Sequence, residues 1–250
     1  MQDNVVAIIQ ARMTSTRLPG KILLPLSGAP LLQRMLERVS RITGLDAIWL
    51  AIPAGKDHDP IVDILPAGVK LFRGSETDVL DRTFKAAKQA NATVVMRITS
   101  DCPIIDPTVS GEILTAFKNS PVVYARTALT SGYPHGFDTE VFTMEALASA
   151  HEEATADDER EHVTPFIWRQ PNRFPALEID HYPDLRYWRL TVDTPEDYQL
   201  VKQIFDILFP RNPNFGFEEL RKLFTTQPEL LEINANIVQP KLADISESNS

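Results

Sequence analysis

Two kinds of hydrophobic pattern alternate along the first hundred residues of this chain. Val5–Gln10, Ala47–Ile52 and Thr93–Ile98 are short runs that are apolar on both faces, as expected of strands buried within a parallel sheet. Between the first two runs, the apolar residues of Leu31–Ile42 recur at helical spacing, with Pro30 before the first turn. The pattern therefore predicts strands that alternate with helices.

Weaker signals complete this half of the chain. A short helix is expected around Ile61–Leu65, followed by a brief strand at "VKLF". Ser75–Asp78 resembles a capping box that opens a helix over Val79–Ala90. This order predicts an α/β fold whose parallel sheet has right-handed crossovers. In such sheets, ligands bind beyond the carboxyl ends of the strands.

The middle of the chain is less regular. Strand-like stretches lie at 122–126, 137–142, 173–179 and 187–192, and "DDEREHVTPFIW" looks helical although Pro165 falls inside it. We expect the region of about 122–185 to form a small antiparallel excursion from the main sheet. Beyond it, Thr194 is a good N-cap for a helix over Thr194–Leu208, with Pro195 in its first turn.

Composition narrows the class of protein. The chain has 250 residues, of which 43% are hydrophobic, which suits one domain over residues 1–238 followed by a polar, disordered tail at 239–250. The formal net charge of -9 argues against a nucleic-acid binder. The single cysteine, Cys102, excludes an internal disulfide framework, and no apolar run is long enough for membrane insertion. We expect a soluble, cytoplasmic protein.

A cationic segment follows the first predicted strand, and we call residues 11–21 the basic loop. It contains Arg12, Arg17 and Lys21, and no acid occurs from Asn4 to Gln33. Ser15 adds a hydroxyl donor. A strand–loop–helix of this composition suits a polyphosphate, although it matches neither the Walker pattern nor G-x-G-x-x-G. The alternative is a solvated basic loop with no ligand.

Two distant aspartates follow strand-like segments. Asp101 comes directly after Thr93–Ile98, and Asp193 follows the run that ends at Val192. Both carboxylates would project near strand ends, where they could converge on a Mg²⁺ that also holds a phosphate. The alternative is that Asp193 helps to cap a helix and Asp101 shapes a turn. Arg73 ends another strand and could face the same cleft.

Three further residues are candidates for binding an acceptor substrate. Asp138 and Glu140 share one face of a strand by the two-residue period, and could bind sugar hydroxyls or a cation, or could form a solvated face. His162 could be a ligand or a base, or could be structural. Arg97 lies within an apolar strand and needs a partner if it is buried.

Several stretches together carry a resemblance. "IIQARMTSTRLPGKILLPLSGAPLLQRMLERV" resembles the opening of the cytidylyltransferases that activate acidic sugars, and is most similar to the CMP-Kdo synthetase type with its P-A-R-x-x-S-T-R-L-P-G-K signature. The stretches "FRGSETDVLDR", "RITSDCPIIDP", "GFDTEVF", "EREHVTPFI" and "RLTVDTPEDYQLV" resemble the spore-coat polysaccharide biosynthesis proteins of the SpsF type. The resemblance covers most of residues 5–235.

The resemblance implies a nucleotide-diphospho-sugar transferase fold, which is a three-layer α/β/α sandwich with a mostly parallel sheet. It implies CTP as the nucleotide substrate, Mg²⁺ as the cofactor and a homodimer. By this resemblance Arg12 and Lys21 would be the catalytic contacts to the triphosphate, and Asp101 and Asp193 the metal ligands. The nucleotide-binding set it implies is Ala11, Arg12, Ser15, Arg17, Lys21 and Arg73.

The expected function is therefore transfer of CMP from CTP to a sugar or sugar-like acceptor in surface-polysaccharide biosynthesis, with release of pyrophosphate. Two departures from the Kdo enzymes stand out: Gln10 replaces the proline before Ala11, and Ser100 replaces the glycine before Asp101. Two alternatives remain open, a nucleotide-sugar-dependent glycosyltransferase and a non-catalytic nucleotide-binding protein. The acids near the acceptor segment favour a neutral or amino acceptor.

Overall fold

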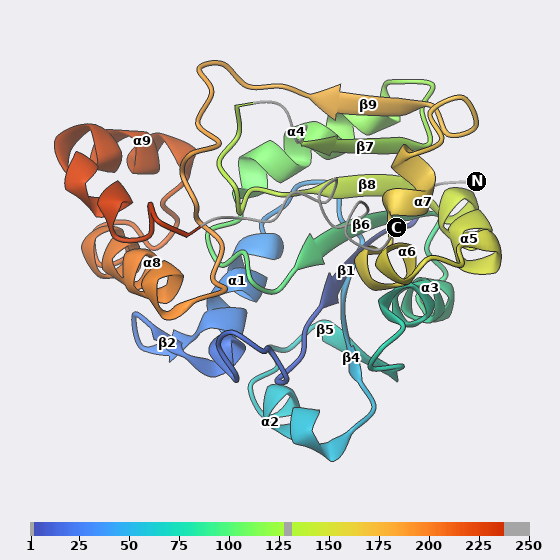
Figure 1. Cartoon of the computed structure of the whole chain (residues 1–250), viewed down its shortest axis with the longest axis horizontal. Helices are drawn as coiled ribbons and strands as arrows, with labels where there is room; N and C mark the ends of the chain where they lie inside the picture. The colour runs from blue at the N-terminus through green and yellow to red at the C-terminus, as the bar shows by residue number, and fades with distance from the viewer. Residues whose placement is uncertain (1–2, 128–131, 238–250) are drawn as a thin grey trace.

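A single mixed sheet organises the chain (Figure 1). The computed structural model describes residues 3–127 and 132–237, so the expected disordered tail at 239–250 lies outside the described residues. The sheet has seven strands in the order β5-β4-β1-β6-β8-β7-β9. These strands are β1 (Val5–Gln10), β4 (Ala47–Pro53), β5 (Val69–Gly74), β6 (Val94–Thr99), β7 (Tyr124–Thr127), β8 (Glu140–Thr143) and β9 (Ala176–Ile179). A separate two-stranded antiparallel sheet pairs β2 (Pro25–Leu26) with β3 (Ala29–Pro30).

Helices connect most of these strands. The longer ones are α1 (Leu31–Val39), α3 (Val79–Gln89), α4 (Pro107–Lys118), α5 (Met144–Glu153), α8 (Pro195–Leu208) and α9 (Phe217–Thr226). The shorter ones are α2 (Asp59–Val62), α6 (Asp157–His162) and α7 (Pro165–Trp168), together with the 3-10 turns η1 (Lys21–Leu23), η2 (Lys56–His58) and η3 (Pro228–Glu232).

Strand direction differs from the expectation for the middle of the chain. β1 pairs in parallel with both β4 and β6, and β4 pairs in parallel with β5. β8 runs antiparallel to its two neighbours, β6 and β7, whereas β7 and β9 are parallel. The predicted antiparallel excursion is thus a reversed strand built into the main sheet, and the mostly parallel α/β fold is confirmed.

Both faces of the sheet are covered by helices, because successive residues of a strand point to opposite faces. Ala7 and Ile9 of β1 pack into one apolar cluster with residues of α1, α2 and α4. Val6 and Ile8 pack into a second cluster with residues of α3, α5 and α7. The layers are therefore helix, sheet and helix, as expected of a three-layer α/β/α sandwich.

A third apolar cluster lies at the end of the sheet to which the arrowheads of β6 and β9 point (Figure 1). Residues of α8 and α9 belong to this cluster, together with Leu31 of α1 and Phe137 before β8. This cluster forms a wall beside the carboxyl ends of the strands, where the fold class places ligands.

The structure corrects three local expectations. Asp78, rather than Ser75, caps α3, because its side chain accepts a hydrogen bond from Asp81 N at 2.8 Å. The helix expected over 157–168 is split into α6 and α7 at Val163, whose φ of 73° lies in the left-handed region. The segment 187–192 forms no strand beyond an isolated bridge between His135 and Arg189.

The reason for this last difference lies in where the backbone amides of the segment point. Leu190 N donates to His135 O at 2.7 Å, and Val192 N donates to Asp101 O at 2.8 Å. The segment is therefore extended but pairs with loops instead of a sheet edge. Among the described residues, no helix combines the length and apolar character needed to cross a bilayer.

Candidate active site

The basic loop leaves β1 at the centre of the sheet and closes on itself. Gly20 N donates to Met13 O at 3.0 Å, and Gly20 has a φ of 68°, a conformation that glycine adopts at little cost. Ala11 is buried and its N–H donates to Ala51 O at 3.2 Å, while Ser15 is half-buried. Lys21 follows the closure directly as the first residue of η1.

Lys21 brings the two predicted aspartates together. Its Nζ lies 2.9 Å from Asp193 Oδ1 and 3.6 Å from Asp101 Oδ2, and it donates to Val192 O at 2.7 Å. These three contacts match the three N–H donors of an ammonium group. The lysine side chain is 9% exposed, so its charge and the two carboxylates compensate one another with little screening by solvent.

Asp193 stands at the most cationic point of this centre. Its Oδ2 lies 3.2 Å from an Arg17 nitrogen and 2.9 Å from an Arg189 nitrogen, in addition to the Lys21 contact. Burial by itself raises the pKa of Asp193, but the three cations outweigh burial and hold that pKa below its ordinary value. Asp193 is therefore a carboxylate at neutral pH.

A buried ion pair supports Asp193 from behind. Both Asp197 oxygens accept from Arg189, at 2.8 and 2.9 Å, and Asp197 is 0% exposed. Asp197 also accepts from the backbone N–H groups of Asp193 and Thr194, and from Asn234 Nδ2 at 2.8 Å. Sequence reasoning missed this support: Arg189, Asp193 and Asp197 all lie in the stretch "RLTVDTPEDYQLV", but nothing in that stretch shows that they pair, and Asn234 lies outside it.

Asp101 is positioned through its own backbone. Its carbonyl oxygen accepts from Val192 N at 2.8 Å and from the Thr191 hydroxyl at 3.1 Å, which ties the loop after β6 to the segment before Asp193. The neighbouring Cys102 is buried, and burial followed by the Asp101 charge raises the pKa of its thiol. A raised thiol pKa disfavours the thiolate, so the surroundings of Cys102 do not suit a nucleophile.

The carboxylate pair has the donor chemistry that Mg²⁺ prefers. Mg²⁺ is usually held by one or two carboxylates, with water and substrate phosphates completing its shell. Within residues 3–127 and 132–237, no group of three or more His, Cys, Asp or Glu side chains forms a self-sufficient metal site. Asp101 and Asp193 therefore fit a metal that arrives with a phosphate ligand.

A second cationic centre lies at the other end of the basic loop. Arg12 is exposed, and no hydrogen bond or ion pair joins its side chain to the described residues. Arg82 of α3 is buried nearby. Its pKa is lowered to about 10, first by burial and then by the charge of Arg12. Arg82 Nε has no hydrogen-bond partner. The charges of Glu76 and Asp78 act on the pKa of Arg82 in the opposite direction and offset part of this effect, and the two cations together suit an anion.

Sequence reasoning did not single out Arg82. The available signal was its place on α3, where it lies three residues after Val79 and so shares the core-facing side of the helix. Arg73 takes a different position from the one expected. It donates to Asp59 Oδ1 at 2.5 Å and to Gly55 O at 3.3 Å, so its partners lie in the segment after β4 and not at Lys21.

The three predicted acceptor residues fall into two groups. Asp138 accepts from Gly136 N at 2.8 Å and lies 3.3 Å from His135 Nδ1, and its charge acts on Cys102 beside Asp101. Asp138 thus faces the Lys21 centre. It precedes β8, whereas Glu140 begins that strand.

Glu140 is part of a network on the sheet. Its carboxylate is paired with Arg97, which also donates to Gln10 Oε1 at 3.1 Å, and it accepts from the hydroxyls of Tyr124 and Thr164. Arg97 therefore has the partner that a buried arginine needs. The charges of Arg97 and Glu140 also act on His162, whose pKa is lowered, mainly by burial. Glu140 and His162 therefore lie near each other, and both carboxylate oxygens of Glu140 are engaged within the protein.

The sandwich fold, the cationic loop after β1 and the two aspartates that meet at Lys21 are features of an α/β protein that binds a phosphorylated ligand. The family comparison is more specific. Residues 6–238 match the model of the cytidylyltransferase family, and the chain belongs to that family.

Individual relatives agree with this assignment. The chain is 34% identical over 237 residues to the spore coat polysaccharide biosynthesis protein SpsF of Bacillus subtilis, covering 91% of this chain and 96% of that protein. A solved cytidylyltransferase from Leptospira borgpetersenii superposes with a TM-score of 0.88 at 29% identity, covering 96% of this chain and 100% of that one. A CMP:2-keto-3-deoxy-manno-octonic acid synthetase solved with CTP shares the fold, with a TM-score of 0.62 at 18% identity over 81% of this chain and 98% of that one.

Proposed function

We propose that this protein transfers CMP from CTP to a sugar or sugar-like acceptor and releases pyrophosphate, as part of surface-polysaccharide biosynthesis. The observation that carries the proposal is Lys21 Nζ lying 2.9 Å and 3.6 Å from the carboxylates of Asp193 and Asp101. The relatedness to SpsF supports the pathway.

In the proposed reaction, an acceptor oxygen attacks the α-phosphorus of CTP in line, and the bond to the β-phosphate breaks. Such a displacement depends mainly on alignment and on neutralisation of charge. Arg12 and Arg82 bind the triphosphate at one end of the basic loop. Lys21 exchanges its longest contact, to Asp101, for an oxygen of the leaving pyrophosphate. Asp101 and Asp193 would hold a Mg²⁺ ion, which would supply Lewis-acid stabilisation of phosphate charge when bound.

A pyrophosphate-release assay tests the role of Lys21. We expect Lys21→Met to lower turnover by about 10²–10³-fold, the usual effect of losing one preorganised electrostatic contact. Lys202→Met is the matched control, because Lys202 is an exposed lysine that pairs with Asp206 on α8. Turnover of Lys21→Met equal to that of the control would contradict the proposed role.

The same assay separates the alternative enzyme class. A glycosyltransferase transfers a sugar from a finished nucleotide sugar and releases no pyrophosphate. Such enzymes usually hold their metal with two acids one residue apart. Asp157 and Glu159 have that spacing, but they lie in the first turn of α6, and Arg169 pairs with Glu159 and with Asp158, which stands between them. Their geometry therefore does not favour a glycosyltransferase.

A non-catalytic nucleotide-binding protein is tested by calorimetry. For a cytidylyltransferase, titration of CTP with and without Mg²⁺ is expected to show that the affinity depends on the metal. A non-catalytic nucleotide-binding protein has no need for the carboxylates of Asp101 and Asp193, so its affinity for CTP would be the same in both titrations. We further propose a cytoplasmic homodimer, which light scattering would test. The acceptor is proposed to be neutral or to carry an amino group, and a panel of such sugars with each nucleoside triphosphate would identify it.

A further inference from the structure

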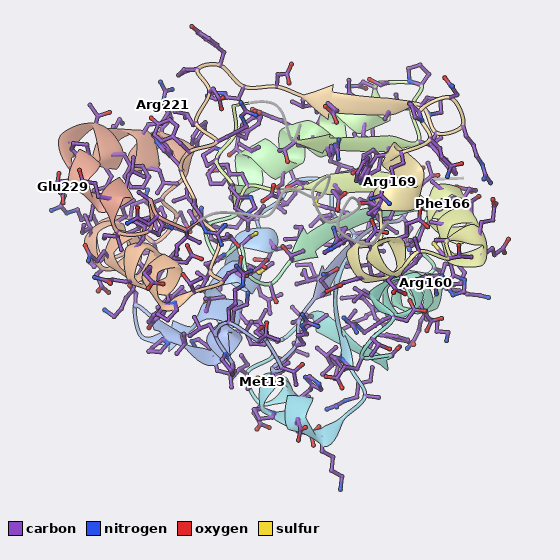
Figure 2. The ribbon with its side chains drawn as sticks, viewed as in Figure 1. Met13, Arg160, Phe166, Arg169, Arg221 and Glu229 are labelled. Atoms are coloured by element: carbon purple, nitrogen blue, oxygen red, sulfur yellow. The ribbon has the colours of Figure 1, made fainter. Side chains whose placement is uncertain are left out.

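A buried histidine contacts the basic loop from outside. His58 belongs to η2, is 1% exposed, and its Nδ1 accepts a hydrogen bond from Met13 N at 3.1 Å. Figure 2 shows Met13 beside the segment that carries η2 and α2. An imidazole nitrogen accepts only when it carries no proton, so His58 must here be neutral, with its proton on Nε2. A buried imidazole is an uncommon partner for a loop amide.

A carboxylate adds a second anchor at the same point. Glu76, in the loop after β5, accepts from the Thr14 hydroxyl at 3.0 Å, and the same oxygen lies 3.7 Å from His58 Nε2. Two consecutive residues of the basic loop, Met13 and Thr14, are thereby fixed to two segments that belong to neither β1 nor η1.

These anchors continue through the loop to Lys21. The carbonyl oxygen of Met13 accepts from Gly20 N at 3.0 Å, and Gly20 is the N-cap residue directly before η1. His58 thus fixes Met13, Met13 fixes Gly20, and Gly20 sets the start of the turn that carries Lys21. Two hydrogen bonds separate His58 from the residue that we place in the phosphate site.

The segment carrying His58 is itself held. Arg73 of β5 donates to Gly55 O and to Asp59 Oδ1, on the two sides of His58. Ala54 N donates to Gly74 O at 2.9 Å. These contacts give Arg73 a role within the protein: it supports the segment from which His58 reaches the loop.

We propose that His58 is a positioning residue, which holds the basic loop in its nucleotide-binding conformation by accepting the Met13 amide. The proposal rests on the proposed function for its catalytic consequence, but the contact itself is independent of substrate. His58 does not touch the reacting atoms. Its effect is on where Arg12 and Lys21 stand, and small displacements of such groups have large kinetic effects.

Two substitutions of the same shape isolate the acceptor. Asn and Leu are branched alike at Cγ, and the Asn side-chain oxygen takes the place of Nδ1, whereas Leu has no acceptor. Hydrogen exchange is measured on the peptide covering residues 11–23, and CTP kinetics are measured by pyrophosphate release. We expect His58→Leu to exchange at least about 10-fold faster over that peptide, with unchanged exchange in α8, and to lose about 10–100-fold in kcat/KM for CTP, mostly through KM.

His58→Asn is expected to restore both measurements to within about threefold of the wild-type protein. Equal exchange in the wild-type protein and His58→Leu would overturn the proposal, and so would failure of His58→Asn to rescue, since a purely space-filling role would leave Asn and Leu alike. The wild-type protein could also fail to release pyrophosphate while hydrogen exchange over residues 11–23 changes as expected in the His58 variants. That outcome would support the positioning role of His58 and reject the proposed function.

A second variant covers the case in which His58→Leu fails to fold. The Glu76 side chain is 51% exposed, so Glu76→Ala is expected to fold normally while it releases Thr14 and the Nε2 side of His58. It should accelerate exchange over residues 11–23 by a few-fold, in the same direction as His58→Leu. Wild-type exchange in Glu76→Ala would count against the proposal.

Discussion

His135 and Asp138 show how a single pair of residues sets a charge state beside the candidate site. Their side chains are 3.3 Å apart, and His135 exchanges backbone hydrogen bonds with the segment around Arg189. Burial lowers the pKa of His135, but the charges of Asp138 and then Asp101 outweigh it and raise that pKa above its ordinary value of 6.5. The same contact lowers the pKa of Asp138. The pair therefore favours an ionised histidine in the folded state.

This raised pKa predicts a pH-dependent contribution to stability. A folded-state pKa above 6.5 means that the contribution is fully present below about pH 6.5 and is lost as pH rises through the folded value. We expect His135→Gln to reduce the free energy of unfolding by up to about 1 kcal/mol at pH 6 and by less at pH 8.5. Urea denaturation at the two pH values measures this. A difference that grows with pH would contradict it.

At the level of elements, the loop before α3 joins two helices through one side chain. Asp78 caps α3 by accepting from Asp81 N, and its other oxygen pairs with Arg160 of α6. Arg160 also donates to His151 O at 2.9 Å, which reaches α5. Three helices on one face of the sheet thus converge on Asp78 and Arg160.

Two variants separate the cap from the ion pair. Asp78→Asn retains an N-cap oxygen, so we expect it to cost less than about 1 kcal/mol of unfolding free energy, the range of a solvent-screened ion pair. Asp78→Ala loses both and is expected to cost about 1–2 kcal/mol more than Asp78→Asn. Chemical denaturation of both variants gives these values, and equal destabilisation would show that the cap contributes nothing.

On the scale of the whole molecule, Arg38 connects the sandwich to the third apolar cluster. It is 2% exposed on α1, and it donates to Ile105 O at 2.8 Å and to Phe215 O at 2.9 Å. Its guanidinium also lies over the Phe215 ring, 4.7 Å from the centroid. Burial lowers the pKa of Arg38 to about 10, so it is charged at neutral pH and binds two distant segments at once.

Replacement of Arg38 should therefore destabilise the whole fold. Arg38→Met leaves two buried carbonyl groups without donors, and we expect it to cost about 2–4 kcal/mol of unfolding free energy. Arg41→Met is the control, since Arg41 is half-buried and makes one side-chain hydrogen bond, to Asn214; its cost is expected to be below about 1 kcal/mol. Comparable losses in the two variants would refute this role for Arg38.

Structural features that depend on neighbouring residues could be predicted from the sequence, whereas contacts between distant segments mostly could not. β1 and α8 were predicted because apolar runs and caps are local signals, and both are confirmed. The meeting of Asp101 with Asp193 was predicted from the strand-end rule, even though the segment before Asp193 is not a strand. The contacts of Arg73 with Gly55 and of His58 with Met13 could not be predicted, because they join loops from different strands.

The N-cap of α3 shows a second limit of prediction from the sequence. In "SETD", Ser75 and Asp78 are both good cap residues, and the sequence does not say which one is used. In the structure, both act in succession: Asp78 N donates to Ser75 Oγ at 3.0 Å, and Asp81 N donates to Asp78 Oδ1. The helix start therefore depends on the turn before it, and that turn is also held by Arg82, which donates to Ser75 O.

The position of the Lys21 ammonium group between Asp101 and Asp193 bears on the order in which metal and nucleotide bind. The ammonium group already makes two hydrogen bonds and a longer ion pair within the protein, so the resting centre carries its own counter-charge. An incoming divalent ion must compete with that counter-charge, while a nucleotide offers the lysine replacement oxygens. On the proposed function, the metal and the nucleotide would therefore bind as one complex. Lys21 would then exchange a carboxylate contact for a contact with a phosphate oxygen.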